Sequence, residues 1–150
     1  MSRQDSGLSA KYVLERTYER SVGPVIGRFL GGLREGKISG IKTRSGKVLV
    51  PPTEYDPETS EALDQWVEVA DRGVVTTWCY ITEPRPGQPL DRPFAWALIR
   101  LDGADTGLLH AVDAGSAERM QTGMRVKARW REKREGSIRD IACFEPENAS

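Results

Sequence analysis

The feature that most limits what this chain can fold into is a change of hydrophobic period at Gly36. From Ser9 to Glu35 the apolar residues recur at steps of three and four, which places them on one face of a helix. Beyond Gly36 they recur at steps of two, in short runs bounded by Gly, Pro and Asp, as they do in strands. The sequence therefore predicts a helical arm followed by a mainly β fold.

The helical arm, residues 10–36, is interrupted at Gly23-Pro24. Proline lacks an N–H and disfavours helix at the residue before it, but it is tolerated in the first turn of a helix. We therefore expect two helices or a sharp kink, with Gly36 ending the second helix. Residues 1–9 and 148–150 are expected to be disordered.

Two short runs, Ile38–Ile41 and Val48–Val50, predict a small hairpin within residues 37–64. Longer strands are predicted at 66–69 continuing into 74–82, and at 94–101, 106–112, 124–132 and 138–144. A short helix capped by Ser116 separates the third of these strands from the fourth. This order is typical of a five-stranded OB-type Greek-key barrel, which we assign to residues 65–147.

The charge balance argues against a partner that is bound through its charge. Lysine plus arginine and aspartate plus glutamate both number 22, so the chain has no net charge that would attract nucleic acid or an anionic membrane over a distance. No signal peptide and no apolar run near the ~20 residues of a membrane helix is visible. We therefore expect a cytoplasmic protein that binds no membrane.

Cys79 and Cys143 lie alone in apolar segments, and both are expected to be buried.

The sequence predicts no catalytic site. The single histidine, His110, lies in the segment LLHAV, and no nucleophile-elbow, metalloprotease or phosphate-loop motif supports it. Asp102, Asp105 and Asp113 fall where loops commonly carry aspartate. We therefore expect no enzyme activity from this chain on its own.

Cations alternate with apolar residues near the C-terminus, so a strand there would carry Arg125, Lys127, Arg129 and Arg131 on one face, and two further cations, Lys133 and Arg134, follow. This basic stripe has two interpretations. It is either a site for the phosphates of a nucleic acid or a nucleotide-bearing ligand, or a solvated face whose charge is offset by Glu132 and Glu135.

The apolar stripe of the helical arm is long for the cover of one small barrel. It either docks on a partner protein or folds back on the hairpin and barrel, and the sequence does not decide between the two. The residues that would face a partner are Tyr18, Val22, Phe29, Leu30 and Leu33.

Seven segments of the chain, taken in order, resemble the zinc-ribbon OB-fold family associated with acyl-CoA thiolases, long described as a domain of unknown function. They are GRFLGGLREGKISG, KTRSGKVLVPP, DPET, VADRGVVTTWCYI, PFAWALIRLDG, TGMRVKARW and ACFEPE. Each segment is weak alone. Their order and spacing, from about Pro24 to Glu147, make the resemblance fairly specific.

Members of that family carry a ribbon with a C-x-x-C-G hook, a P-P pair and a C-P-x-C hook. On this chain the four metal positions fall at Lys42, Ser45, Asp56 and Thr59, and none is a cysteine. A structural zinc site needs four soft or imidazole ligands, which these side chains do not supply. The resemblance therefore implies a degenerate ribbon over residues 37–64, with no zinc and no other bound cofactor. We expect an ion pair between Lys42 and Asp56 in place of the metal.

The resemblance also implies a non-catalytic accessory subunit of a thiolase-like enzyme, either a sterol-carrier-protein-type thiolase or a thiolase-fold aldolase. The partner would supply lyase or acyltransferase chemistry in steroid side-chain or fatty-acid degradation, within a heterotetramer of two enzyme and two accessory chains. This chain would shape or shield the acyl-CoA channel, with acyl-CoA as a ligand shared with the partner. Arg125, Lys127 and Arg129 would then meet the phosphates of coenzyme A, and a proline-rich loop would touch the partner through Pro86 and Pro89.

Two other functions stay open. OB barrels commonly bind single-stranded nucleic acid, but Trp78, Trp96 and Trp130 alternate with polar residues as core residues do. No aromatic surface for stacking bases is therefore predicted, which makes nucleic acid a disfavoured partner. The third function is that of a structural module without a ligand.

Overall fold

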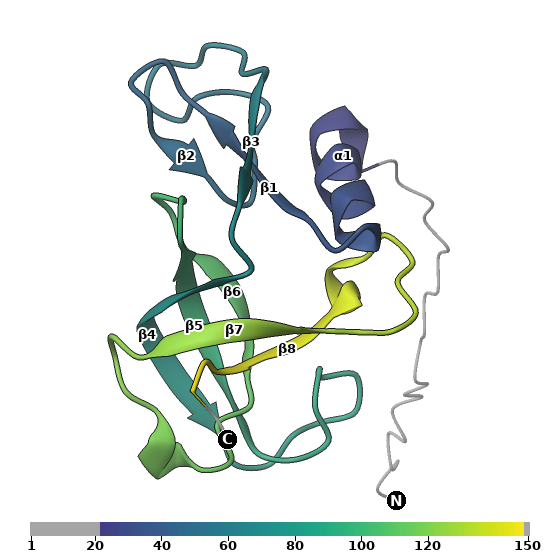
Figure 1. Ribbon diagram of the computed structural model, residues 1–150, viewed down its shortest axis with the longest axis vertical. Coiled ribbons are helices and arrows are strands. Elements are labelled where there is room, and N and C mark those ends of the chain that lie inside the picture. The colour runs from purple at the N-terminus through teal and green to yellow at the C-terminus, as the bar shows by residue number, and fades with distance from the viewer. Residues whose placement is uncertain (1–21, 149–150) are drawn as a thin grey trace, which may run out of the picture.

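The computed structural model describes residues 22–148, so the predictions for residues 1–21, including Tyr18, and for 149–150 lie outside the described part. Helix α1 (Gly23–Arg34) comes first, then a small sheet of β1 (Ile38–Lys42), β2 (Val48–Leu49) and β3 (Gln65–Val69). The barrel strands are β4 (Arg72–Ile81), β5 (Phe94–Leu101), β6 (Leu108–Val112), β7 (Arg125–Trp130) and β8 (Ile141–Pro146). Two short 3-10 helices, η1 (Ala117–Arg119) and η2 (Ile138–Asp140), precede β7 and β8. Figure 1 shows α1 and the small sheet side by side above the barrel.

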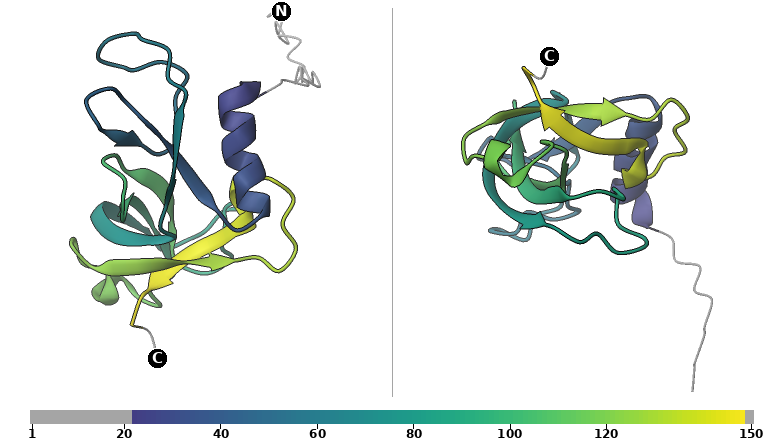
Figure 2. Two further views of the ribbon diagram at one scale, coloured as in Figure 1. Left: turned by 45° about the horizontal axis from the view of Figure 1, so that its top comes forward. Right: turned by 90° about the horizontal axis from the view of Figure 1, so that it is seen from below.

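The barrel closes in the order β4-β5-β6-β8-β7. Its neighbouring strands are antiparallel, except for the parallel contact of β6 with β8 at Val112 and Phe144. Val75, Ile99 and Val126 are fully buried in its interior. Helix η1 lies between the third and fourth barrel strands, as predicted, and Figure 2 shows it beside one end of the barrel. The predicted mainly β fold with an OB-type barrel is therefore confirmed.

The small sheet has the order β2-β1-β3. Strand β3 pairs with all of β1, from Ile38 opposite Val69 to Lys42 opposite Gln65. Strand β3, which the prediction joined to the barrel strand that follows, therefore belongs to the small sheet. The sequence pattern failed here because β3 runs directly towards β4, so two strands of different sheets look like one interrupted strand.

The ends of α1 follow the sequence signals. Pro24 occupies the first turn, and Gly36 follows the last turn with a φ of 74°. The Gly36 N–H donates to Leu33 O at 3.0 Å and the Lys37 N–H donates to Gly32 O at 2.9 Å. This pair of bonds is the Schellman motif, which favours glycine because its left-handed residue has no Cβ to clash.

Within residues 22–148 no helix is long and apolar enough to cross a membrane.

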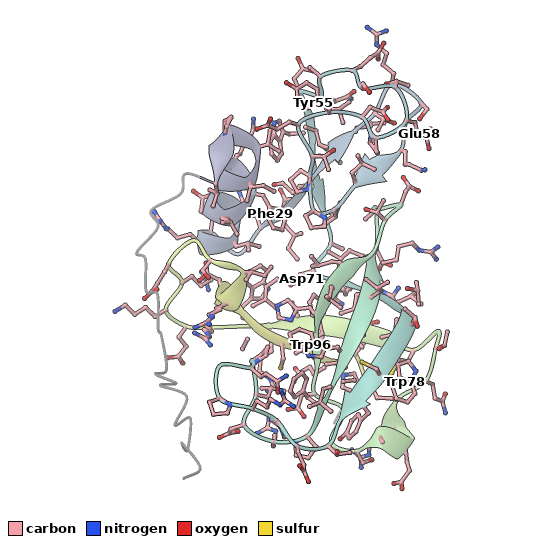
Figure 3. The ribbon with its side chains drawn as sticks, turned by 180° about the vertical axis from the view of Figure 1, so that it is seen from behind. Phe29, Tyr55, Glu58, Asp71, Trp78 and Trp96 are labelled. Atoms are coloured by element: carbon pink, nitrogen blue, oxygen red, sulfur yellow. The ribbon has the colours of Figure 1, made fainter. Side chains whose placement is uncertain are left out.

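The apolar face of α1 points into the molecule. Phe29 and Leu33 are buried in the main core and Leu30 packs against that core. Figure 3 shows Phe29 on the side of α1 that faces the small sheet. Phe29 and Leu33 are therefore unavailable to a partner. This burial agrees with the interpretation in which the apolar side of the arm folds back on the hairpin and barrel. Val22 remains 56% exposed.

The two cysteines differ in burial. Cys143 is buried, as predicted, but Cys79 is exposed, so that prediction is wrong. The cause is a β-bulge in β4 between Val75 and Thr77. A bulge adds one residue to one strand and reverses which face the following side chains take. Trp78 therefore turns towards the core, and Cys79 turns outward.

Candidate functional site

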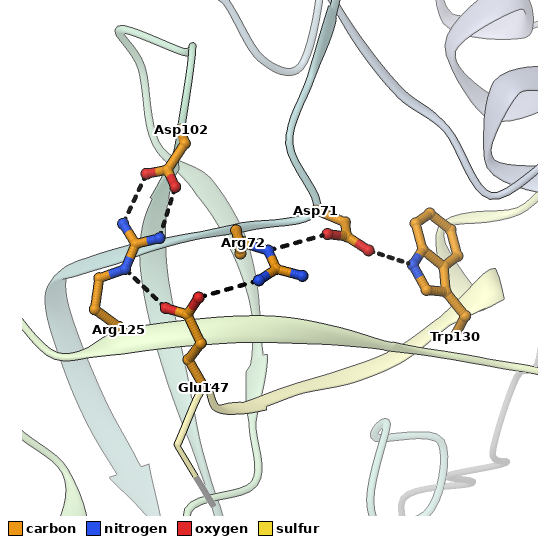
Figure 4. Close-up of polar contacts among 6 residues, drawn as sticks. All are labelled: Asp71, Arg72, Asp102, Arg125, Trp130 and Glu147. Carbon is orange, nitrogen blue, oxygen red and sulfur yellow. Dashed lines mark hydrogen bonds and ion pairs between the residues drawn. The ribbon is translucent and has the colours of Figure 1, made fainter.

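The predicted basic stripe lies on β7, where acidic residues from other elements meet it. Arg125 donates from Nη1 and Nη2 to the two carboxylate oxygens of Asp102 at 2.7 and 2.6 Å. Its Nε donates to Glu147 at 2.9 Å. Figure 4 shows this two-sided arrangement, with the Arg125 guanidinium between the two carboxylates. Each donor side chain drawn there, Arg72, Arg125 or Trp130, is directed at a carboxylate of this chain.

The same network continues across the barrel surface to Trp130 (Figure 4). Glu147 also accepts from Arg72 at 3.1 Å, Arg72 pairs with Asp71 at 3.6 Å, and Asp71 accepts the Trp130 indole N–H at 3.1 Å. Hydrogen bonds from Arg125 hold the pKa of Asp102 and of Glu147 below the ordinary carboxylate range. Both carboxylates are therefore fully ionised at neutral pH.

Arg129 is engaged in the same way. It donates to Glu145 at 2.6 and 2.9 Å and to Asp113 at 3.4 Å, and Asp113 also forms an ion pair with Arg92. Burial acts to raise the pKa of Asp113, but Arg92 and Arg129 outweigh it and hold the pKa below its ordinary value. In the described part of the chain Lys127 and Arg131 are the stripe residues that have no ion pair.

Arg125 and Arg129 of the basic stripe are therefore neutralised within the chain. A coenzyme A phosphate approaching Arg125 or Arg129 would have to displace fixed carboxylates and would be repelled by them. The geometry thus favours the solvated-face interpretation, although Glu132 and Glu135 are not the residues that offset the charge. The offsetting acids are Asp102, Asp113, Glu145 and Glu147, and binding of coenzyme A phosphates at the stripe stays a prediction.

The four former metal positions do not form a metal site. Ser45 and Asp56 border a small cavity of about 90 Å³, which Lys42 and Thr59 do not line. Asp56 is buried, and its Oδ1 already accepts the N–H of Glu58 at 2.8 Å. Among residues 22–148 no cluster of three or more His, Cys, Asp or Glu side chains could hold a metal ion. These side chains therefore do not fit a structural zinc.

The predicted ion pair between Lys42 and Asp56 is wrong. Among the described residues, the ion pairs in this region are instead Lys47 with Glu58 at 3.3 Å and Arg44 with Glu61 at 3.1 Å. Each links the first turn of the ribbon to the second. Asp56 is not free for Lys42 because its carboxylate closes its own turn by accepting the Glu58 N–H. Figure 3 shows Tyr55 and Glu58 at the end of the ribbon that is far from the barrel.

The ribbon is anchored to the barrel through the loop between β5 and β6. Asp105 accepts the Val48 N–H through Oδ2 at 2.8 Å, and its own N–H donates to Val48 O at 2.9 Å. Thr106 Oγ1 accepts the Val50 N–H at 2.8 Å and donates to Val50 O at 3.0 Å. This loop thus pairs with the edge of the ribbon at two successive positions, as a neighbouring strand would.

His110 is a structural residue in this fold. Its side chain is only 5% exposed and packs edge-on against Phe144, with ring centroids 5.4 Å apart. Nδ1 accepts the Ala111 N–H at 2.8 Å, so the neutral ring carries its proton on Nε2, which lies 3.5 Å from Ile138 O. Burial lowers the pKa of His110, so the ring is neutral at physiological pH.

The tryptophans predicted as core residues pack against core clusters, but each is half-buried and not fully buried. Trp78 and Trp130 pack against the main core, and Trp96 packs against a second cluster around Phe94 and Cys143. The Trp130 ring is held by Asp71 in addition. All three rings are therefore partly used in packing, which disfavours a surface for stacking bases.

Comparisons with known proteins find one family model and several solved structures that this chain resembles. Residues 66–131 match the family described as ChsH2, C-terminal OB-fold domain. The chain is similar to a protein of unknown function from the DUF35 family of Sulfolobus solfataricus, at 28% identity and a TM-score of 0.59, over 71% of this chain and 77% of that one.

A second solved structure resembles the chain over more of its length. It is a chain of the Ltp2-ChsH2(DUF35) aldolase, with 18% identity and a TM-score of 0.62, over 85% of this chain and 98% of that one. At this identity the likeness shows the fold alone. No curated protein sequence matches the chain.

Proposed function

We propose that this chain is a non-catalytic accessory subunit of a thiolase-like enzyme that acts on acyl-CoA, because residues 66–131 match the ChsH2 C-terminal OB-fold family and the chain resembles a DUF35-family protein. The observation that carries this proposal is the likeness in fold to a chain of the Ltp2-ChsH2(DUF35) aldolase, which covers 85% of this chain. The partner of that type would be a thiolase or a thiolase-fold aldolase. It would work in steroid side-chain or fatty-acid degradation.

The chemistry of the described side chains supports a non-catalytic role. His110 is buried and bonded on both ring nitrogens, so it is not available as a general base. Burial raises the pKa of the Cys143 thiol to about 11, which keeps it protonated and unreactive at neutral pH. The lyase or acyltransferase step would therefore belong to the partner.

The surface that meets the partner would combine exposed apolar residues of the arm and of the proline-rich loop. Val22 is exposed at the start of α1, and Pro86 and Pro89 are exposed in the loop between β4 and β5. Two accessory chains would join two enzyme chains in a heterotetramer, and this chain would shield the acyl-CoA channel of the partner.

The test is co-expression with the thiolase-like protein encoded nearest to this chain, followed by an acyl-CoA cleavage assay with and without it. We expect a partner that is inactive or insoluble alone and active in the complex. Val22→Asp should weaken the complex at least about tenfold, because a charge would be buried at the interface. Thr77→Asp, which places the same charge on an exposed barrel strand, is the matched control. Equal partner activity with and without this chain would reject an accessory role.

Nucleic-acid binding is the second candidate. The neutralised Arg125 and Arg129 and the partly packed tryptophans oppose it, because phosphate binding needs free cations and base binding needs open aromatic faces. Oligonucleotide affinity that falls steeply with salt concentration would reverse this ranking.

A further inference from the structure

We propose that a cavity beside the proline-rich loop binds a small amphipathic anion, an apolar chain that ends in a carboxylate or phosphate. The cavity has a volume of about 470 Å³ and lies between the loop residues 87–89, strands β5, β6 and β8, and helix η2. Of the basic stripe only Arg131 lines it, at the end of the stripe that lies beyond β7. The inference does not rest on the proposed function, because it concerns a ligand of this chain alone.

The wall of the cavity suits an apolar chain. Trp96, Leu109, Ile138 and Ile141 line it. Leu109 and Ile138 remain 59% and 40% exposed, so two large apolar side chains face water at its mouth. A ligand that covered them would remove apolar surface from water, which is favourable. Figure 3 shows Trp96 on the part of the barrel beside this loop.

The mouth of the cavity also carries two cations, Arg131 and Arg139. Neither side chain makes a hydrogen bond or an ion pair within residues 22–148. Arg125 and Arg129, by contrast, are bound to carboxylates of this chain. Guanidinium groups bind carboxylates and phosphates through paired N–H donors, so these two arginines fit the head of an anionic ligand.

The loop that presents both arginines is fixed by a buried carboxylate. Asp140 is 2% exposed and accepts the N–H groups of Glu135, Gly136 and Ser137 at 2.8 to 3.1 Å. Its carbonyl accepts the Arg131 N–H at 2.9 Å. The backbone at both arginines is therefore held in place while their side chains stay unpaired. Because a ligand would not have to order this backbone, the entropy cost of binding is lower.

A third polar group faces the same space. His110 lines the cavity, and its Nε2–H reaches Ile138 O only at 3.5 Å, at the long limit of a hydrogen bond. A ligand oxygen placed closer would be a better acceptor. The cavity thus combines an apolar wall with one weakly bonded donor and two unpaired cations. This composition is typical of a small-molecule site.

The volume limits the ligand to a short chain. At about 30 Å³ for each water-sized group, the cavity holds roughly fifteen such groups, so octanoate with its about ten non-hydrogen atoms fits. A volume of this size also lies within the range of ligand pockets, ~300–1,000 Å³.

The experiment titrates the full chain with octanoate, octyl phosphate and 1-octanol by calorimetry, each below its micelle-forming concentration. We expect at least one anion to bind with one-to-one stoichiometry and at least about tenfold more tightly than the alcohol, because charge-assisted hydrogen bonds add to the apolar contact. The anion that binds more tightly identifies the head group. No binding of either anion, or equal binding of the alcohol, would overturn the proposal.

Two double variants locate the site. Arg131→Gln with Arg139→Gln removes the cations that line the cavity, and Arg100→Gln with Arg119→Gln removes the same charge away from it. All four residues are exposed or half-buried, so both variants should fold, which circular dichroism checks. The first should lose about tenfold or more in anion affinity, and the second should keep it. Equal losses of affinity in both variants would overturn the proposal. So would a wild-type dimer, measured by light scattering, that dissociates in the first variant, because a second copy of the chain would then fill the cavity.

Discussion

Thr106→Val should destabilise the ribbon, because the structure makes Thr106 part of its anchor on the barrel. The hydroxyl accepts the Val50 N–H at 2.8 Å and donates to Val50 O at 3.0 Å, and Val50 is fully buried. Valine has the shape of threonine but neither donates nor accepts. The substitution therefore leaves a buried N–H and a buried C=O without these partners.

An unsatisfied buried backbone group costs about 1–3 kcal/mol, so we expect the free energy of unfolding to fall by about 2 kcal/mol. With a denaturant slope of about 2 kcal/mol/M, the midpoint in urea should fall by about 1 M. Thr77→Val is the matched control, since Thr77 is exposed on β4 and makes no side-chain hydrogen bond among the described residues. It should change stability by no more than about 0.5 kcal/mol.

Amide hydrogen exchange locates the effect. In Thr106→Val the Val48 and Val50 amides should exchange faster, because both are bonded to the anchoring loop, while the Ile99 amide inside the barrel should change less. If Thr106→Val and Thr77→Val have the same urea midpoint, the β5–β6 loop is not what holds the ribbon.

Three further predictions follow from the described contacts. Elemental analysis of the purified protein should find well under one zinc per chain, because the ribbon side chains do not form a zinc site. A chelator should leave the melting temperature unchanged. A stoichiometric metal whose removal unfolds the ribbon would contradict this. The lowered pKa values of Asp102 and Glu147 contribute stability that is present above their ordinary values of 3.8 and 4.5 and is lost as pH falls through the lower folded values. The urea midpoint of the wild type should therefore fall more between pH 6 and pH 3 than that of Arg125→Met, and parallel curves would refute the pairing. A thiol reagent at neutral pH should modify Cys79, which is exposed, and not Cys143, whose pKa is raised to about 11 by burial; modification of both thiols in the folded state would be inconsistent with the structure.

The sequence indicated the fold correctly at several places where a local signal controls the structure, but it predicted the start of a strand at 138–140, which form η2 after the cap residue Ser137. The period change at Gly36, the Schellman glycine itself and the short helix before Arg125 were all visible in the order of residues. These features depend on neighbours within a few positions, which a single sequence displays.

The sequence did not indicate features that depend on contacts between distant segments. Arg125 and Arg129 looked like a free basic stripe because the acids that neutralise Arg125 most directly, Asp102 and Glu147, lie 23 and 22 residues away in the chain. The bulge between Val75 and Thr77 has no glycine or proline to mark it, and it reverses the facing of Cys79. A single sequence carries no record of such pairings.

The cavity was missed for the same reason. Its wall combines Trp96 from β5 and Leu109 from β6, and its cations, Arg131 and Arg139, lie at the two ends of one loop. The sequence did single out Arg131 as a cation, but as part of the basic stripe. Unlike Arg125 and Arg129, Arg131 forms no ion pair, because it follows the last residue of β7 and no acidic strand residue faces it.

The most direct test of the account is the mass of the particle that this chain forms with its thiolase-like partner, measured by size-exclusion chromatography with light scattering after co-expression. The account predicts a complex in which the two chains are present in equal number, with a mass equal to two copies of each. Two separate peaks, one of them a stable monomer of this chain, would contradict the proposal that it is an accessory subunit.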